Sequence, residues 1–254
     1  MTYSAAQIDR WTAVGDQDAA KRTYASIRRA LDESPRLQRY SFDVYLQGSY
    51  ANHTNISGDS DVDIVVELES TITVETSRLD AVEKARYQAQ RIPATITIDE
   101  FRRDVEQVLT DAYGSRRVNP ENKCIRVEGE RGMIDADVVP ALEHRLYTSW
   151  GATGPSWIPG IEIRPRRGGS IVNFPKEHIK NGQAKNGRAN NNYKPTVRQV
   201  KQLCIAAADG GLPGYVLECM VFNVPDQRFS EDEAQSRLIS ALSEAPMDVK
   251  RRFG

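Results

Sequence analysis

Apolar and polar residues alternate with a period of two over several short segments, which is the pattern of strands in a sheet. The clearest example is the apolar run from Val62 to Val66, which only Asp63 interrupts. We expect strands at Ser41–Leu46, Asp61–Leu68, Lys123–Glu128, Met133–Val139 and Gly160–Arg164. The third and fourth segments flank a short turn with two glycines, which predicts a hairpin. Pro140 is expected to end the fourth strand, because proline donates no backbone hydrogen bond.

Apolar residues at helical spacing predict helices before, between and after these strands. Ser4 and Thr97 are the expected N-caps of the first helix and of the helix Ile98–Tyr113, which Gly114 is expected to end. The other helices are expected within Ser4–Glu33, at Glu75–Gln90, Lys176–Lys180, Pro195–Ala208 (ended by Gly210-Gly211) and Pro213–Val224, and from a cap at Ser230 through Leu242.

The stretch Trp150–Gly169 is rich in glycine, proline and arginine, and we expect it to connect two lobes. The division predicted from it places the sheet and the N-terminal helix in residues 1–155 and a helical lobe in residues 156–254. The second lobe is short, and we expect terminal helices to be missing from it. Within this lobe, Lys185–Asn192 is polar and is expected to be mobile.

Composition argues against several protein classes. No apolar run approaches the roughly 20 residues that span a bilayer, and the N-terminal stretch lacks the basic and apolar regions of a signal peptide. The three cysteines are widely spaced, which is typical of the reducing cytoplasm and not of a disulfide framework. The formal net charge is −1, so a general affinity for polyanions is not expected.

Basic residues are nevertheless concentrated in one part of the chain. Residues 164–201 contain ten lysines and arginines and a single acid, Glu177. Such a local excess of positive charge suits nucleoside triphosphates or a nucleic acid strand. A helix places Lys194, Arg198 and Lys201 on one face, because they lie four and three residues apart. We expect this face to contact a triphosphate, and a solvated basic face is the alternative interpretation.

The main candidate for chemistry is the pair Asp61 and Asp63 at the start of the second strand. Alternation places both carboxylates on one face, where they repel each other unless a cation lies between them. Carboxylate oxygens suit Mg²⁺ or Mn²⁺, and Mg²⁺ commonly binds together with substrate phosphates. Upstream, Gly48 allows close approach of a ligand, and Ser49 offers a hydroxyl and an N–H to phosphate oxygens. A solvated turn before an edge strand is the alternative.

A third carboxylate lies in the second strand of the predicted hairpin. Residues 133–141 read MIDADVVPA, so Asp135 and Asp137 share a face. Phosphoryl transfer with two metal ions uses a third acidic ligand for the ion that activates the attacking hydroxyl. Asp137 is our candidate for this ligand, and Asp135 is the alternative.

Together, Gly48-Ser49, Asp61-x-Asp63 and Asp137-Val138-Val139-Pro140 resemble the DNA polymerase β-like nucleotidyltransferases. Within that group the chain is most similar to the cGAS/DncV-like enzymes, the bacterial CD-NTases with a SMODS-type domain. The resemblance covers nearly the whole chain, because it continues in the second half at Asn173–His178, Lys185-Asn186, Tyr193-Lys194, Val197–Lys201, Leu212–Cys219 and Phe222–Pro225.

The resemblance implies an α+β fold with a polymerase β-like palm, which is a mixed sheet with helices, a helical substrate-binding lobe and an active site in the cleft between them. It implies that the three aspartates are catalytic and bind two Mg²⁺ ions, with Mn²⁺ as a substitute. It also implies that Gly48 and Ser49 hold the donor triphosphate, that Lys201 contacts it, and that Tyr215 stacks on a base. Gly214 stands where the family has serine, so one hydroxyl contact to the triphosphate is missing.

The activity implied by the resemblance is synthesis of a cyclic di- or trinucleotide second messenger from NTPs, with pyrophosphate release, in bacterial antiphage (CBASS-type) signalling. A separate effector protein would read the product, and the basic excess permits an activating protein or nucleic acid; no membrane partner is expected. The alternatives are nucleotidyl transfer to another acceptor, such as an RNA end, a protein hydroxyl or an antibiotic, and a non-catalytic nucleotide-binding module.

Overall fold

The computed structural model describes residues 3–56, 58, 61–206, 212–230 and 233–244, which fall into two compact units. The sheet unit comprises Asp18–Gln47 and Asp61–His178. The helical unit comprises Met1–Gln17, Gly48–Ser60 and Ile179–Gly254. The segment that connects the first two strands therefore belongs to the helical unit, although both strands belong to the sheet unit. The division into domains at residues 155 and 156 stays a prediction.

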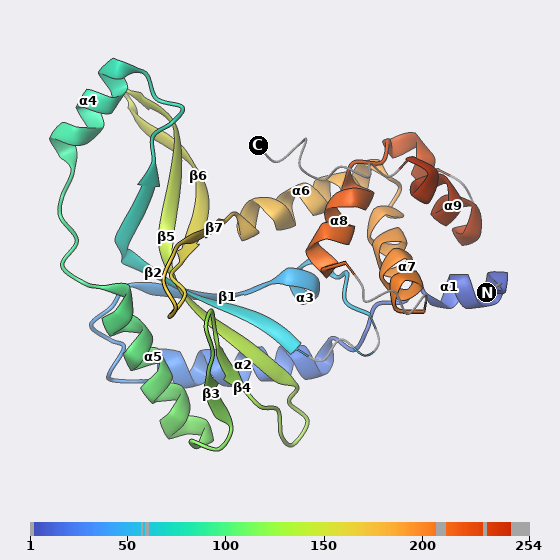
Figure 1. The fold of residues 1–254 in the computed structure, drawn as a ribbon, viewed down its shortest axis with the longest axis horizontal. Coiled ribbons are helices and arrows are strands. Elements are labelled where there is room, and N and C mark those ends of the chain that lie inside the picture. Colours follow the sequence, from blue (N-terminus) through green and yellow to red (C-terminus); the bar gives the residue numbers. More distant parts are fainter. Residues whose placement is uncertain (1–2, 57, 59–60, 207–211, 231–232, 245–254) are drawn as a thin grey trace. The chain divides into compact units, whose positions relative to one another are not determined.

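The described residues contribute seven strands to one mixed sheet, ordered β1-β2-β5-β4-β3, with β6 paired to β5 and β7 paired to β6 (Figure 1). Only β2 and β5 run parallel within this part of the chain, so the predicted mixed sheet is confirmed. The strands are β1 (Phe42–Gln47), β2 (Asp61–Glu75), β3 (Val118–Pro120), β4 (Ile125–Val127), β5 (Asp135–Gly151), β6 (Gly154–Ile163) and β7 (Ile171–Asn173).

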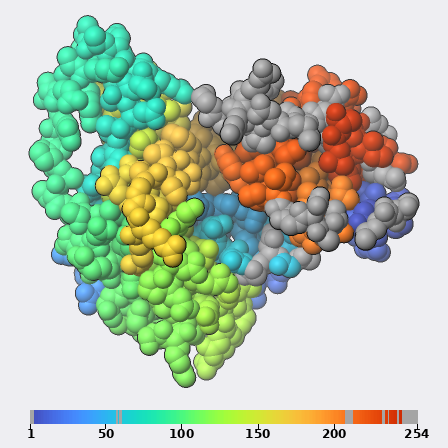
Figure 2. Space-filling view, in the orientation of Figure 1, coloured from blue at the N-terminus to red at the C-terminus, as the bar shows by residue number. Residues whose placement is uncertain are grey.

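Helices α2 (Asp18–Asp32) and α5 (Ile98–Tyr113) pack on the sheet and on each other. The apolar stripe of α5 is buried, as its helical spacing predicts. Both expected ends of α5 are confirmed: the Thr97 side chain accepts from the Glu100 N–H (3.3 Å), and Gly114 follows with φ of 83°. Beside the C-terminal parts of β2 and β5, α4 (Ala81–Gln90) and the mostly exposed loop 91–97 project from the sheet (Figure 2).

The prediction that Pro140 ends its strand is wrong, since β5 continues to Gly151. Pro140 pairs with Val66 of β2 on one side. On the other side, pairing with β4 stops at Val138 and pairing with β6 starts at Leu142. Pro140 thus lies where β5 has no neighbour on one side, and the missing N–H breaks no bond there.

The expectation that Trp150–Gly169 is a crossing segment is also wrong over most of its length. Residues up to Gly151 complete β5, and β6 folds back on it as an antiparallel hairpin that includes Pro155 and Pro159. β6 is accordingly longer than the short strand predicted at Gly160–Arg164. β2 likewise runs past the predicted Leu68 to Glu75, because β5 continues to pair with it through a register shift. Composition alone did not reveal that these long strands support one another.

The helical unit holds α1 (Ala5–Arg10), α3 (Gly48–Asn52), most of α6 (Pro175–Arg188), and also α7 (Tyr193–Ala206), α8 (Gly214–Phe222), a 3₁₀ turn η1 (Asp226–Phe229) and α9 (Ala234–Glu244). Its core lies between α7, α8 and the following turns, around Tyr193, Val197, Leu217 and Phe229. The predicted cap holds for α1, where Ser4 Oγ accepts from the Gln7 N–H (3.2 Å).

The predictions for α6 and for the cap of α9 are wrong. α6 has 14 residues and is not a single turn at Lys176–Lys180, and it includes the first half of the segment Lys185–Asn192 that was expected to be mobile. Ser230 follows η1 as its C-terminal cap residue and does not cap α9. The expected stop at Gly210-Gly211 lies outside the described residues. Within the described ranges, no helix has the length and apolar character needed to cross a membrane.

Candidate active site

The parallel register of β2 and β5 aligns four aspartates on one face of the sheet. Asp61 lies opposite Asp135, and Asp63 lies opposite Asp137. In each strand the residue between the two acids, Val62 or Ala136, is fully buried on the other face. Alternation along each strand and side-by-side pairing between them therefore bring together the three predicted catalytic residues and the alternative Asp135.

Burial and mutual repulsion favour the protonated forms of two of these carboxyl groups. Burial raises the pKa of Asp63 to about 6, and the charges of Asp137 and Asp61 add to the effect. Burial also raises the pKa of Asp137, again with the Asp61 charge contributing. The neighbouring Cys124 thiol is held protonated, since burial and the Asp137 charge raise its pKa to about 12. The site is thus a concentrated negative charge without enough positive charge to balance it.

Arg126 supplies the positive charge that this face does contain. It lies in the middle of β4, directly opposite Asp137. Its guanidinium is 2.6 Å from Asp135 Oδ2, 3.3 Å from Asp61 Oδ2 and 3.9 Å from Asp137 Oδ1. The Arg126 charge opposes the increase in the Asp137 pKa. One arginine therefore partly neutralises three of the four carboxylates.

Asp135 differs from the other three acids. Its Oδ1 accepts from the Gly129 N–H (2.7 Å), and its Oδ2 accepts from Arg126. These donors lower the pKa of Asp135, with the Gly129 N–H as the main cause. Both of its oxygens are thus engaged within the protein, whereas Asp137 Oδ1 is buried and accepts no hydrogen bond. This difference favours Asp137 over Asp135 as the third ligand.

The chemistry of this donor set fits a divalent cation. Three carboxylates are the ligands that Mg²⁺ and Mn²⁺ prefer, and an orphaned buried oxygen together with raised pKa values indicates a missing positive charge. As the side chains stand, no three histidine, cysteine, aspartate or glutamate residues among those described are grouped so that they could hold a metal ion. Binding would require the carboxylates to draw together and Arg126 to give up part of its contact with Asp61.

The predicted triphosphate residues Gly48 and Ser49 follow β1 directly and begin α3 in the helical unit. Gly48 has φ of 69°, a left-handed conformation that favours glycine. Its predecessor Gln47 pairs with Asp63 across β1 and β2. Gln47, which pairs with the candidate catalytic residue Asp63, is therefore bonded directly to Gly48.

Two of the three basic side chains predicted to share a face of α7 have partners inside the helical unit. Lys201 is buried and pairs with Glu218 (2.8 Å). Arg198 is also buried, and it donates to the backbone oxygens of Thr12 (2.7 Å) and His53. Lys194 is half-buried; burial lowers its pKa, and the Arg198 charge contributes. The predicted contact of these three residues with a triphosphate stays a prediction.

Tyr215, the predicted stacking residue, lies in the first turn of α8 with 56% of its surface exposed. An exposed ring can receive a base without repacking of the core. Its role in base stacking stays a prediction.

The basic excess over residues 164–201 is largely balanced by acids from elsewhere in the sequence. Arg166 pairs with Glu106 of α5 (2.5 Å), and Lys176 pairs with Glu67 of β2 (2.9 Å). Lys185 and Arg188 both contact Asp226. The positive charge that is concentrated in the sequence is therefore dispersed in the folded chain.

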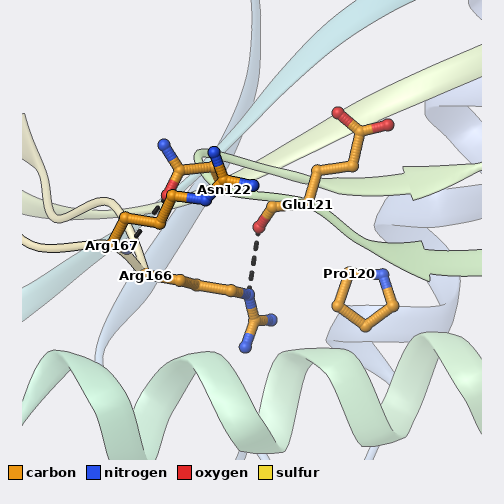
Figure 3. Close-up of a pocket in the computed structure, with 5 residues that line it drawn as sticks. All are labelled: Pro120, Glu121, Asn122, Arg166 and Arg167. Atoms are coloured by element: carbon orange, nitrogen blue, oxygen red, sulfur yellow. Dashed lines mark hydrogen bonds between the residues drawn. The ribbon is translucent and has the colours of Figure 1, made fainter.

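The sheet unit also contains a pocket that is lined by residues of the turn between β3 and β4 and of the loop before β7 (Figure 3). Pro120, Glu121, Asn122, Arg166 and Arg167 line it, and none of the candidate catalytic residues does. Arg166 donates to the Glu121 carbonyl (3.0 Å), and the Arg167 N–H donates to Asn122 Oδ1 (3.0 Å). These contacts fix the loop before β7 against the turn between β3 and β4, which gives the pocket walls a structural role.

Two charged residues at or near the predicted sites were not predicted from the sequence. Arg126 stands between the buried Ile125 and Val127, and an arginine within so short an apolar strand is a signal that it faces charged neighbours. Glu218 is an acid in the strongly apolar stretch of α8 and is only 3% exposed. In both cases the sequence contained a charge in an apolar context, but the partner was distant in the chain.

Comparison with known proteins covers both halves of the chain. Residues 27–124 match the model of the nucleotidyltransferase domain, and residues 180–251 match that of the cGAS/DncV-like nucleotidyltransferase C-terminal helical domain. Cyclic nucleotide synthase CdnE01 of Staphylococcus haemolyticus is 38% identical over an alignment 254 residues long, which covers 96% of this chain and 84% of that protein. Cyclic UMP-AMP synthase of Rhodothermus marinus is 39% identical over an alignment 240 residues long, which covers 90% of this chain and 79% of that protein.

Solved structures agree with these matches. The structure of Rhodothermus marinus CdnE c-UMP-AMP synthase with Apcpp and Upnpp has a TM-score of 0.81 at 36% identity, and covers 95% of this chain and 82% of its own. The structure of the Elizabethkingia meningoseptica CdnE cyclic dinucleotide synthase with GTP and Apcpp has a TM-score of 0.69 at 26% identity, over 95% of this chain and 83% of that one. The extent and identity of these matches show that the chain belongs to the cGAS/DncV-like nucleotidyltransferases.

Proposed function

We propose that this chain joins NTPs into a cyclic di- or trinucleotide second messenger, with release of pyrophosphate. The proposal rests on the four-aspartate face of β2 and β5 and on relatives that are named as cyclic nucleotide synthases. We infer that the enzyme acts in the bacterial cytoplasm in antiphage signalling, that a separate effector protein reads the product, and that a partner protein or a nucleic acid can activate synthesis.

The observation that carries the proposal is the alignment of Asp63 with Asp137 beside Asp61. Nucleotidyl transfer needs no protein nucleophile, because the attacking group is a hydroxyl of the acceptor nucleotide. The catalytic demand is instead a rigid cluster of negative ligands at the position of the reacting phosphate. Strands β2 and β5 supply that rigidity, because their backbones are hydrogen-bonded to each other along the segment that carries the acids.

We assign metal binding to Asp61, Asp63 and Asp137. Two divalent ions, when bound, supply the charge that lowers the pKa of the acceptor hydroxyl and stabilises the pyrophosphate leaving group. Asp63 has to lose its proton to act as a ligand, and burial together with its acidic neighbours delays that loss until about pH 6. Asp135 keeps Arg126 at the edge of the cluster, where its charge limits repulsion among the acids.

Gly48 and Ser49 are assigned to the donor triphosphate, with Lys194, Arg198 and Lys201 as its basic contacts and Tyr215 as the stacking surface for a base. Gly48 leaves the backbone N–H groups that follow it accessible, because it has no side chain. The Tyr215 ring is exposed, as a stacking surface requires, and stacking tolerates different bases at about 1–3 kcal/mol each. Base choice therefore has to come from other contacts.

Product analysis tests the proposal. The protein is incubated with ATP, CTP, GTP and UTP and with Mg²⁺ or Mn²⁺, then treated with phosphatase and examined by mass spectrometry. A matched Asp61→Asn/Asp63→Asn variant keeps the size of both side chains and removes two ligand charges. We expect a phosphatase-resistant cyclic product from the wild-type chain and none from the variant.

Other outcomes would redirect or refute the proposal. A linear product extended on added RNA, or a nucleotide attached to a protein, would assign the enzyme to another acceptor. Tight, Mg²⁺-dependent NTP binding without pyrophosphate release under all these conditions would favour a binding module. Cyclic product in equal amounts from both proteins would refute the assignment of the aspartates.

A further inference from the structure

Three buried charged side chains of the helical unit converge on residues 52–54, which lie just after Gly48-Ser49. Glu218 comes from α8, and Lys201 and Arg198 come from α7. Their exposed fractions are 3%, 7% and 8%. Charged residues are rarely buried this deeply unless specific partners hold them.

Glu218 is the centre of this cluster. Its Oε1 accepts from Thr54 Oγ1 (2.6 Å) and from Lys201 Nζ (2.8 Å), and its Oε2 accepts from Asn52 Nδ2 (3.3 Å). Lys201 Nζ also donates to the backbone oxygen of Thr54 (3.1 Å). The ion pair therefore holds residues 52 and 54 through both side-chain and backbone atoms.

The backbone between and after these residues is fixed as well. Arg198 donates to the His53 oxygen, and the Gly15 N–H donates to the Asn55 oxygen (3.1 Å). His53 has φ of 55°, a conformation that non-glycine residues adopt only where the surroundings enforce it. Successive residues from 52 to 55 are thus held individually by the helical unit.

A backbone hydrogen bond connects residues 52–55 to the Gly48-Ser49 pair. The Thr54 N–H donates to the Ser49 oxygen (2.9 Å), which closes the loop around α3. Fixing Thr54 therefore also fixes the carbonyl end of Ser49. The α3 segment is too short to be a stable helix alone, so its geometry depends on these contacts.

Gly214 lies beside the Lys201 side chain. A Cβ at this position would lie 3.3 Å from Lys201 Cε and 3.4 Å from Nζ, at the short end of van der Waals contact. The Lys201 side chain thus fills the space beside residue 214 while it is paired with Glu218.

We propose that Lys201 and Glu218 form a buried clamp that holds residues 48–54 in the conformation that receives the triphosphate, and that Glu218 is a positioning residue for the reaction. The triphosphate part rests on the proposed function; the clamp itself does not. It differs from the expectation that Lys201 acts only as a triphosphate ligand, because that expectation gives Glu218 no role and would make its negative charge unfavourable for NTP binding.

Two measurements on Glu218→Gln and Lys201→Met test the clamp. Amide hydrogen exchange of the nucleotide-free protein reports the order of residues 48–56. Pyrophosphate release with the four NTPs and Mg²⁺ gives kcat and KM. Lys185→Met is the matched control, because Lys185 is a similarly buried lysine of the same unit whose side chain donates to Asp226 and to the Val224 oxygen instead of to residues 48–56.

We expect both clamp variants to raise exchange in residues 48–56 by about tenfold or more, and to raise KM by about tenfold with a smaller change in kcat. The control is expected to change neither quantity, although it lowers stability. A pure ligand role predicts the opposite for Glu218→Gln: unchanged exchange and an unchanged or lower KM. That result would overturn the proposal.

A milder pair of variants covers the case in which the charge substitutions do not fold. Thr54→Val replaces the hydroxyl that donates to Glu218 with a methyl group, whereas Thr54→Ser keeps that hydroxyl. We expect faster amide exchange in residues 48–56 for the valine variant, and exchange close to that of the wild type for the serine variant. Equal exchange for both variants would refute the clamp. If the wild-type protein released no pyrophosphate, the proposed function would fail while the exchange comparison still decided the clamp.

Discussion

Replacing Asp63 by asparagine is expected to stabilise the metal-free protein at neutral pH, although Asp63 is a proposed catalytic residue. Asp63 has a folded-state pKa of about 6, above its ordinary value of 3.8. The folded state therefore binds the proton more tightly than the unfolded state, so the free energy of unfolding falls as pH rises from about 4 to about 6 and stays lower above that. Asparagine resembles the protonated form and does not lose this stability.

The magnitude follows from the pKa difference. An increase from 3.8 to about 6 corresponds to about 3 kcal/mol at pH values above both. Arg126 lies beside the cluster, and part of the face is open to solvent, so some of this energy is screened. We expect Asp63→Asn to raise the free energy of unfolding by about 1–3 kcal/mol at pH 8 and by much less at pH 4.

Urea denaturation in EDTA at pH 4, 5, 6, 7 and 8 measures this effect, because the free energy of unfolding depends linearly on denaturant. Asp135→Asn is the matched control, an identical substitution on the neighbouring strand. The Gly129 N–H and Arg126 lower the pKa of Asp135, so its charged form is the stable one. This variant is expected to be less stable than the wild type at pH 8, with the difference lost as pH falls below the ordinary aspartate pKa.

A decrease in stability for Asp63→Asn at pH 8 would refute the reasoning. It would mean that Arg126 already balances the cluster, and that repulsion among the acids does not govern this face. The same sign for both aspartate variants would lead to the same conclusion. Addition of Mg²⁺ provides a further check, since it should stabilise the wild-type chain more than Asp63→Asn.

Three other results are expected. Arg126→Gln should raise Mg²⁺ affinity severalfold in titration calorimetry at pH 7.5, because the guanidinium repels the cation. Arg126→Lys keeps the positive charge and should bind Mg²⁺ more nearly like the wild type. Equal or weaker Mg²⁺ binding by Arg126→Gln would contradict this. Wild-type Mg²⁺ affinity should fall by up to about tenfold per pH unit below pH 6, as Asp63 takes up its proton, and a flat profile would argue against Asp63 as a ligand. Gly129→Ala should lower the free energy of unfolding in urea by about 1–3 kcal/mol, since its Cβ would lie 2.5 Å from the Met133 oxygen. Gly187→Ala in α6 is the control and should be neutral or stabilising, because its Cβ would meet nothing within 4 Å. Equal effects of the two substitutions would contradict this.

The part of the site that could be predicted from the sequence is the part defined by local geometry. Alternation placed Asp61 with Asp63 and Asp135 with Asp137, and the structure has both pairs on one sheet face. The choice between Asp135 and Asp137 could not be made from spacing. It depends on the Gly129 N–H and on Arg126, which reach Asp135 only after the hairpin and the sheet have formed.

Strand lengths show the same limit. Pro140 and the proline-rich β6 read as breaks, because local rules consider the hydrogen bonds of one segment only. In the folded chain Pro140 lies at the gap between β4 and β6, where no neighbour needs its N–H. Whether a proline interrupts a strand is decided by the strands beside it.

By itself, the sequence determined the helices of clear periodicity, the caps Ser4 and Thr97, and the acidic faces of two strands, since all of these depend on residues within a few positions of one another. Only the tertiary structure decided which charges are balanced. The basic excess of residues 164–201 looked free in sequence, yet Lys201 pairs with Glu218 and Lys176 pairs with Glu67. A buried charge is stable only beside a partner, and that partner can lie anywhere along the chain, so its identity becomes known only when the fold brings the two together.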